Sequence, residues 1–198
     1  TINPRDYYFH DYLEGKIVAV IGTGNIGFKL ARVLSTLGAQ VKAYSPNLTK
    51  DKALEMGAVF CASLHEALSN ADMLTIQVPF VHDDANANQT YKLIGNEEVA
   101  LLNKGAFVIN VSRADVVDME AIIQNIKSEQ LAAFVLDTMQ SEIKQIMNQY
   151  PGITQNPHIY LTPSIATASN KLKTQLTKES LHRIYAYFEE NKIIDQVS

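Results

Sequence analysis

Residues 17–27 read Ile-Val-Ala-Val-Ile-Gly-Thr-Gly-Asn-Ile-Gly, and this stretch decides the fold. Its five apolar residues predict a buried strand, and an amphipathic helical pattern follows over residues 28–37. Gly22 permits a tight turn, Gly24 lets a diphosphate approach the backbone, and Gly27 lets the helix pack close to the sheet. The spacing therefore predicts a strand, turn and helix that bind a dinucleotide, with a purely structural glycine turn as the alternative.

Composition and charge narrow the class of protein. The chain has 198 residues, of which 46% are hydrophobic and 19% charged, as in a globular domain. A net charge of −4 without a basic tract argues against nucleic acid or a membrane as a partner. With the single cysteine Cys61, no membrane-spanning run and no signal peptide, we expect a cytoplasmic protein without a metal site. Because the chain begins with Thr1, we also expect a fragment or a processed chain.

Strand and helix patterns alternate along the rest of the chain. This alternation predicts right-handed crossovers and a parallel sheet covered on both faces, an α/β doubly wound fold of the Rossmann type. A long helix is expected over residues 169–190. We predict a single nucleotide-binding domain over residues 1–198, with an N-terminal arm (1–15), a core (16–166) and a C-terminal helix and tail (167–198). Further strands are predicted at residues 41–44, 59–60, 72–78, 106–111, 131–136 and 159–162.

The loops after the strands are where such a sheet binds its ligands, because ligands lie beyond the carboxyl ends of the strands. Most of the unusual residue clusters of the chain fall in these loops, which predicts one continuous cleft. The loops are residues 22–27, 44–47, 78–84, 111–115, and 137–142 with 162–166.

Five motifs in these loops carry a resemblance to a known family. They are Gly22-Thr-Gly-Asn-Ile-Gly27, Val78-Pro79, Ile109-Asn-Val-Ser-Arg113 with Val117-Asp118, Leu136-Asp137 followed by Glu142, and Thr162-Pro163-Ser164-Ile165-Ala166. In this order they resemble the D-isomer-specific 2-hydroxyacid dehydrogenases, over the NAD-binding domain and the C-terminal helix. The resemblance implies hydride transfer between NAD(P)H and a small 2-oxo or 2-hydroxy acid. In that family a domain-sized N-terminal segment forms most of the substrate domain, and we expect this chain to lack it.

Three positions match the catalytic residues of the family. Arg113 follows a buried strand, and its guanidinium can bind the carboxylate and carbonyl of a 2-oxo acid; a salt bridge to Asp115 or Asp118 is the alternative. Glu142 matches the carboxylate that hydrogen-bonds the family's catalytic histidine, and a solvated helical glutamate is the alternative. Ser164 occupies the position of that histidine.

Serine cannot act as a general acid near neutral pH, so a contribution of about 10²–10⁴-fold is expected to be missing at Ser164. Three interpretations stay open: an inactive site, a different proton donor, and an altered reaction. Among the other histidines, His82 follows the Val78-Pro79 motif and is the candidate donor, with a solvated loop histidine as the alternative.

The cofactor assignment is NAD, with NADP as the alternative. The second strand ends at Tyr44-Ser45-Pro46-Asn47 without the carboxylate that usually accepts from the 2′-hydroxyl of the adenosine ribose. The resemblance implies that Asp137 contacts the nicotinamide carboxamide, although an aspartate there could instead cap the next helix. The predicted cofactor-binding residues are Gly22, Gly24, Asn25, Ile26, Gly27, Ser45, Val78, Pro79, Val111, Ser112, Arg113 and Asp137.

Aromatic residues gather at positions 7–12, before the first strand. Exposed, they would form an apolar patch that needs a partner. In the resembled enzymes this neighbourhood helps to build a dimer, so we expect a homodimer, with packing against the chain's own sheet edge as the alternative. For function, we expect an oxidoreductase domain, and the rival is a catalytically inactive NAD(P)-binding sensor or scaffold.

Overall fold

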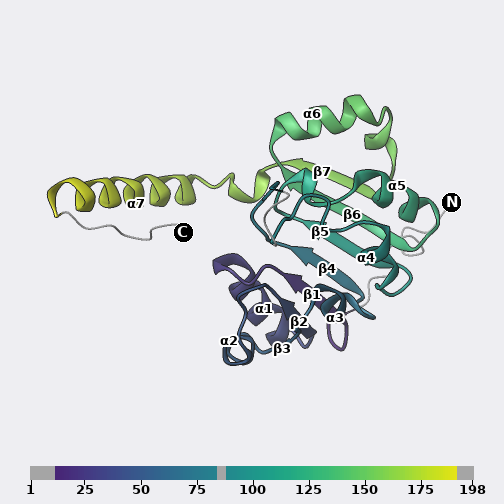
Figure 1. Cartoon of the computed structure of the whole chain (residues 1–198). Coiled ribbons are helices and arrows are strands. Elements are labelled where there is room, and N and C mark those ends of the chain that lie inside the picture. The colour runs from purple at the N-terminus through teal and green to yellow at the C-terminus, as the bar shows by residue number, and fades with distance from the viewer. Residues whose placement is uncertain (1–11, 84–87, 191–198) are drawn as a thin grey trace. The chain divides into compact units, whose positions relative to one another are not determined.

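The computed structural model describes residues 12–83 and 88–190 (Figure 1). The chain divides into two compact units, Thr1–Pro163 and Ser164–Ser198. The first unit contains the sheet, and the second contains one long helix. The aromatic residues at positions 7–11 lie outside the described residues, so the dimer contact predicted there is not addressed. The predicted arm, core and C-terminal segment stay predictions.

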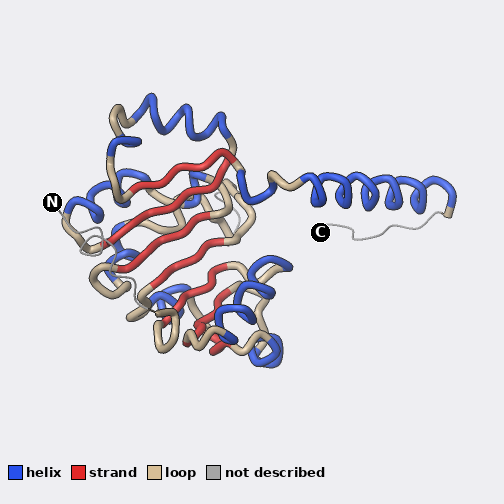
Figure 2. The backbone as a smooth tube through the Cα atoms, turned by 180° about the vertical axis from the view of Figure 1, so that it is seen from behind, coloured by secondary structure: helices blue, strands red, loops and turns tan. Residues whose placement is uncertain are grey.

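The sheet of the first unit has seven parallel strands in the order β3-β2-β1-β4-β5-β6-β7. Figure 2 shows these strands side by side. The strand order reverses between β1 and β4, and ligands bind at such a switch point in open α/β sheets. The doubly wound Rossmann-type prediction is confirmed. The strands are β1 Ile17–Ile21, β2 Gln40–Tyr44, β3 Ala58–Phe60, β4 Met73–Ile76, β5 Ala106–Asn110, β6 Leu131–Thr138 and β7 Ile159–Pro163.

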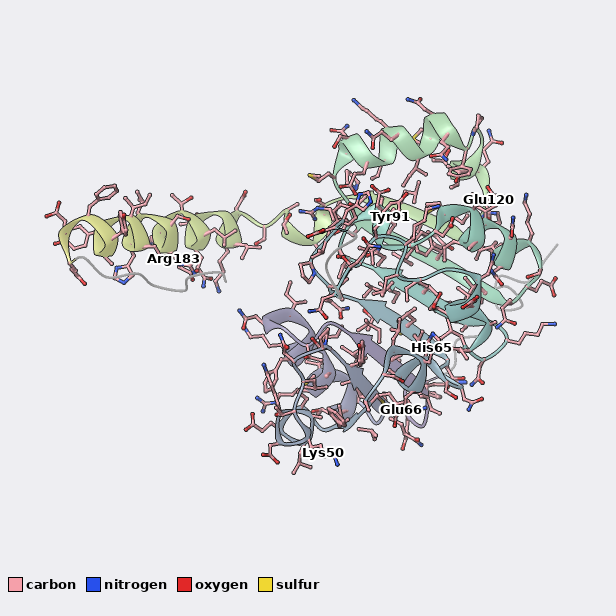
Figure 3. The ribbon with its side chains drawn as sticks, viewed as in Figure 1. Lys50, His65, Glu66, Tyr91, Glu120 and Arg183 are labelled. Carbon is pink, nitrogen blue, oxygen red and sulfur yellow. The ribbon has the colours of Figure 1, made fainter. Side chains whose placement is uncertain are left out.

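Helices connect the strands, and most begin at a residue whose side chain suits an N-cap. At the start of α3, the Ser63 hydroxyl accepts a hydrogen bond from the Glu66 N–H at 3.1 Å, and the Glu66 carboxylate accepts from the Ala62 N–H at 2.7 Å. Both Glu66 and His65 of that helix are labelled in Figure 3. The helices are α1 Asn25–Thr36, α2 Lys50–Glu55, α3 Leu64–Leu68, α4 Asn96–Ala100, α5 Met119–Lys127, α6 Gln140–Gln149 and α7 Asn170–Glu189.

Two apolar clusters cover opposite faces of the sheet, because alternate residues of a strand point to opposite sides. Val18 and Val20 of β1 pack with α1 and α2. Ala19 and Ile21 belong to the other cluster, with apolar residues of α3, α4 and α5. With both faces of β1 buried, the run of five apolar residues is explained by burial on two sides.

The second unit begins at Ser164 and contains α7. Ser164 has a left-handed backbone, with φ 51° and ψ 44°, a conformation that non-glycine residues adopt rarely. Helix α7 is capped by the Ser169 hydroxyl, which accepts from the Leu172 N–H at 3.4 Å. No described helix, α7 included, is both long enough and apolar enough to cross a bilayer.

Candidate functional site

The glycine-rich turn lies at the switch point of the sheet. Gly22 has φ +93°, and its N–H donates to the Tyr44 carbonyl at 2.9 Å. A Cβ on Gly22 would lie 2.6 Å from the backbone oxygen of Gln77, which follows β4. The turn therefore passes so close to the neighbouring strand that only glycine fits.

Gly27 explains the close packing of α1. A Cβ there would lie 1.9 Å from the Gly22 carbonyl oxygen, closer than any real contact. The first turn of the helix thus rests directly on the glycine turn, as the sequence motif predicts.

Gly24 differs from Gly22 and Gly27 because no neighbouring atom crowds it, so its surroundings show whether the turn has room for a diphosphate. Its φ of −67° is ordinary, and a Cβ on it would meet nothing within 4 Å. Gly24 is the N-cap of α1 but offers no side-chain cap, and no acidic residue occupies the first helical turn. Asn25 and Ile26 are exposed beside it. An open backbone at an uncapped helix N-terminus is suited to an anion, so the residues present fit the diphosphate of a dinucleotide.

A pocket of ≈ 210 Å³ adjoins this turn. It lies among the carboxyl ends of β1, β2 and β4. Ser45, predicted to contact the cofactor, lines it, and so does Val78. No aspartate or glutamate is among the described residues that line it. The lining residues are Ile21, Gly22, Tyr44, Ser45, Pro46, Leu64, Val78, Asn88, Gln89, Thr90 and Leu93.

Hydrogen bonds to Thr90 hold the loop that follows β4. The Thr90 hydroxyl donates to the Pro79 carbonyl at 2.7 Å and accepts from the Val81 N–H at 2.7 Å. Pro79 is exposed and Val78 is half-buried. The Ser112 hydroxyl, from the loop after β5, donates to the Val78 carbonyl. The predicted cofactor residues Val78 and Ser112 are therefore joined directly.

The loop after β5 is shaped by the buried Asn110. Its amide nitrogen donates to the Arg113 carbonyl at 2.8 Å, and its amide oxygen accepts from the Ser112 N–H at 2.9 Å. Val111 is 39% exposed, whereas Ser112 is buried. Sequence reasoning did not assign this role to Asn110, although a polar residue that ends a buried strand is a signal that could have found it.

Arg113 and Glu142 are brought together. The Arg113 Nε lies 3.8 Å from Glu142 Oε1, with the side chains 49% and 17% exposed. Among the described residues, Arg113 does not form the alternative salt bridge to Asp115 or Asp118, and Asp118 pairs with Lys92 at 3.1 Å. The Arg113 guanidinium also donates to the Ser112 carbonyl at 3.0 Å.

The Glu142 carboxylate accepts two further hydrogen bonds. The Ala114 N–H donates to Oε2 at 2.9 Å, and the Thr138 hydroxyl donates to the same oxygen at 2.5 Å. Glu142 is therefore not a solvated helical glutamate. It ties the start of α6 to the backbone that follows Arg113.

Asp137 lies within β6 rather than after it, since the strand extends to Thr138. The Thr162 hydroxyl of β7 donates to its Oδ1 at 2.6 Å. The N-cap of α6 is Met139, so the alternative role of Asp137 as that cap is wrong. The prediction that Asp137 contacts the nicotinamide stays open.

Ser164, at the position of the family's histidine, and His82, the candidate proton donor, have different surroundings. Ser164 belongs to the second unit and is described above with it. His82 is exposed, and its ring stacks on Tyr91 with the centroids 4.3 Å apart; Tyr91 is labelled in Figure 3. The described residues contain no group of three or more metal-ligating side chains.

Ion pairing sets the pKa of Asp118, the N-cap of α5. Partial burial raises the pKa of this carboxyl, but the hydrogen bond and charge of Lys92 and the N–H groups of Glu120 and Ala121 outweigh burial. The net result is a pKa below its ordinary value. The same pairing raises the pKa of Lys92. The pair holds together the ends of two loops beside Arg113.

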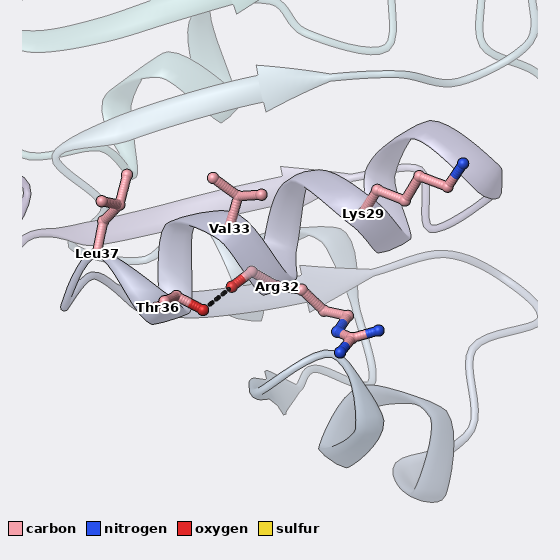
Figure 4. A pocket seen from close by; sticks show the side chains of 5 residues that line it. All are labelled: Lys29, Arg32, Val33, Thr36 and Leu37. Atoms are coloured by element: carbon pink, nitrogen blue, oxygen red, sulfur yellow. Dashed lines mark hydrogen bonds between the residues drawn. The ribbon is translucent and has the colours of Figure 1, made fainter.

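A second, larger pocket of ≈ 410 Å³ lies on the outer surface of α1 (Figure 4). Lys29, Arg32, Val33, Thr36 and Leu37 line it, and the Thr36 hydroxyl donates to the Arg32 carbonyl at 2.8 Å. Val33 and Leu37 are each 55% exposed. None of the predicted catalytic or cofactor residues lines this pocket.

Comparisons with known proteins agree with this geometry. A family model described as D-isomer specific 2-hydroxyacid dehydrogenase, NAD binding domain, matches residues 3–166. A D-3-phosphoglycerate dehydrogenase of Methanocaldococcus jannaschii is 30% identical over 130 residues, which are 66% of this chain and 24% of that protein. A glyoxylate reductase of Aeropyrum pernix is 26% identical over 175 residues, 88% of this chain and 49% of that protein.

Solved structures share the fold. The structure of D-2-hydroxyisocaproate dehydrogenase superposes with a TM-score of 0.82 at 24% identity, over 96% of this chain and 58% of that one. The chain spans between about a quarter and about half of the length of the curated relatives it matches. Because the family model covers more than half of the chain, the protein belongs to the D-isomer specific 2-hydroxyacid dehydrogenase family, as its NAD-binding domain.

Proposed function

We propose that the chain is the cofactor-binding part of an oxidoreductase that acts on a small 2-oxo or 2-hydroxy acid. When bound, NAD supplies or accepts the hydride at its nicotinamide ring. Gly22, Gly24 and Gly27 would hold the diphosphate, and the 210 Å³ pocket would hold the adenosine end. Val78, Ser112 and Asp137 would line the nicotinamide side.

Arg113 is the proposed substrate-binding residue. Its planar fork suits the carboxylate and carbonyl of a 2-oxo acid. Its partner Glu142 also receives the Ala114 N–H, so the carboxylate positions the whole Arg113 loop. This Arg113–Glu142 pair, which lies beyond the carboxyl ends of β5 and β6 at the same edge of the sheet as the glycine turn, is the observation that carries the proposal.

Ser164 limits the chemistry that we propose. A hydroxyl does not release a proton near neutral pH, so proton transfer to the substrate oxygen would depend on water or on another group. We propose that this chain binds the cofactor and reduces 2-oxo acids weakly, if at all.

Two titrations and one variant test the proposal. NADH and NADPH are titrated against the chain, and comparable failure of both would overturn the cofactor assignment. Reduction of a panel of small 2-oxo acids is then compared for the wild-type chain and Ser164→His. A rise of about 10²–10⁴-fold in the variant supports an oxidoreductase site in which the residue at position 164 supplies the missing acid.

Ser164 also favours a second candidate, an inactive NAD(P)-binding sensor or scaffold. Tight NADH binding by Ser164→His without a gain in 2-oxo acid reduction would favour this reading. Substitution of Arg113 separates the two further, because only an oxidoreductase needs a substrate clamp, so Arg113→Met should abolish any 2-oxo acid reduction gained in Ser164→His.

A homodimer in the cytoplasm completes the proposal. The exposed Val33 and Leu37 on the outer surface of α1 support a contact with a second copy, and a single buried cysteine, Cys61, without a disulfide is compatible with a reducing compartment. Sedimentation at high concentration tests the dimer, and a monomer there contradicts it.

A further inference from the structure

The pocket beside the glycine turn contains a buried polar atom without a partner. The side-chain oxygen Oε1 of Gln89 is shielded from solvent and forms no hydrogen bond within the described residues. Gln89 lines the pocket together with Ser45 and Gly22. A buried amide oxygen without a donor is unfavourable, so the side chain gains a hydrogen bond if it turns toward a donor of a ligand in the pocket that Gln89 lines.

The position of Gln89 is fixed by its neighbour. Thr90 is buried and is held by hydrogen bonds on three sides: its hydroxyl contacts Pro79 and Val81, and its N–H donates to the Val81 carbonyl at 2.9 Å. The backbone next to Gln89 is therefore anchored to the end of β4.

The end of β2 lacks the acceptor that a dinucleotide site usually provides. In such sites a carboxylate at this position accepts from the 2′-hydroxyl of the adenosine ribose. Here the strand ends in Tyr44, Ser45 and Pro46, all of which line the same pocket as Gln89. Lys42 is also committed elsewhere, since its ammonium donates to the Ser69 carbonyl at 2.7 Å. The pocket thus lacks a carboxylate at the end of β2 and contains one acceptor, on Gln89, without a donor.

We propose that Gln89 replaces the missing carboxylate and accepts the hydrogen bond of the adenosine 2′-hydroxyl. This inference rests on the proposed placement of the adenosine end in the pocket. A neutral amide would also admit NADPH, because its NH₂ group can donate to a 2′-phosphate where a carboxylate repels it. Gln89 is therefore a specificity-determining residue that discriminates only modestly between NADH and NADPH.

The test compares NADH with its analogue that lacks the adenosine 2′-hydroxyl. Both are titrated against the full chain by their own fluorescence, which is convenient because the chain contains no tryptophan. The wild type should bind the deoxy analogue about two- to tenfold more weakly than NADH, the range for one neutral hydrogen bond. Gln89→Leu should weaken NADH binding by that same factor and leave the deoxy analogue unchanged.

Two further variants sharpen the result. Gln40→Leu makes the same change on an exposed residue at the opposite end of β2 and should alter neither affinity. Gln89→Glu should raise the preference for NADH over NADPH by about tenfold or more, because its charge repels the 2′-phosphate. Thermal unfolding of Gln89→Leu without ligand should occur no earlier than in the wild type, since the substitution removes an acceptor without a donor.

Three outcomes would overturn the inference. If Gln89→Leu retains the wild-type preference for NADH over the deoxy analogue, the 2′-hydroxyl has another acceptor. If the variant weakens both ligands equally, Gln89 contacts a different donor, such as the adenine amino group. If the wild type binds neither ligand, the proposed cofactor placement fails as well, and this result is distinct from the other two.

Discussion

Gly27→Ala should mainly lower the stability of the fold, whereas Gly24→Ala should mainly weaken cofactor binding. In Gly27→Ala the new methyl carbon would lie 1.9 Å from the Gly22 carbonyl oxygen. To reach an ordinary contact, α1 and the glycine turn must separate by more than about 1 Å in a tightly packed region. Overpacking of this kind commonly costs about 1–3 kcal/mol, and a backbone clash belongs at or above the upper end.

We expect Gly27→Ala to lower the free energy of unfolding by about 3 kcal/mol or more. For a chain of this size that corresponds to a fall of roughly 6–12 °C in the thermal midpoint. Urea unfolding followed by circular dichroism measures the effect.

Gly24→Ala is the matched control, because its methyl group would meet nothing within 4 Å and its φ is ordinary. Its stability should fall by no more than about 1 kcal/mol, the cost of replacing a glycine N-cap by alanine. Its NADH affinity should fall by roughly tenfold or more, because the methyl group fills the space through which the diphosphate approaches. A Gly27→Ala variant of wild-type stability would refute the packing argument. Undiminished NADH binding by Gly24→Ala would refute the placement of the diphosphate.

Three further predictions concern residues outside the glycine turn. Glu142→Ala should destabilise the chain by about 1–3 kcal/mol in urea unfolding because the Ala114 N–H loses its acceptor, and Glu142→Gln should destabilise it less; equal effects would contradict this. The folded pKa of Asp118 lies below its ordinary value of 3.8, so its pairing with Lys92 stabilises the fold above that pH and is lost as the pH falls further. Lys92→Met should therefore flatten the acid limb of a stability–pH curve, and an unchanged limb would count against the pairing. Burial and then the Glu66 charge raise the pKa of the Cys61 thiol, so a thiol reagent should modify native protein far more slowly than unfolded protein.

The glycine turn was predictable from sequence because its determinants are local. Strand, turn and helix each depend on residues within one short stretch, and each glycine has a separate backbone requirement. The structure gives those requirements at Gly22 and Gly27, where a Cβ would meet backbone oxygens. The position of Arg113 after a buried strand was predictable for the same reason.

The partners of the charged residues were not predictable, because they come from distant parts of the chain. Asp137 receives the hydroxyl of Thr162, and Glu142 receives the N–H of Ala114. From residue type alone, Asp137 could equally have been a helix cap and Glu142 a solvated side chain. Gln89 was missed because it lies in a polar loop without a motif, and only the packed pocket distinguishes it from its neighbours.

The hydrogen bonds between the loops indicate that the residues proposed to bind cofactor and substrate are held in place independently of the residue at the proton-donor position. Val78 is tied to Ser112, and Glu142 to Ala114, by contacts made without any ligand. These loops are therefore ordered before a cofactor arrives, which reduces the entropy lost on binding. All of them belong to the first unit, whereas Ser164 belongs to the second. The groups proposed to bind cofactor and substrate can thus persist while the proton donor is replaced, so Ser164→His should change turnover without changing NADH affinity. A variant that altered NADH affinity severalfold would show that the two roles are not separable.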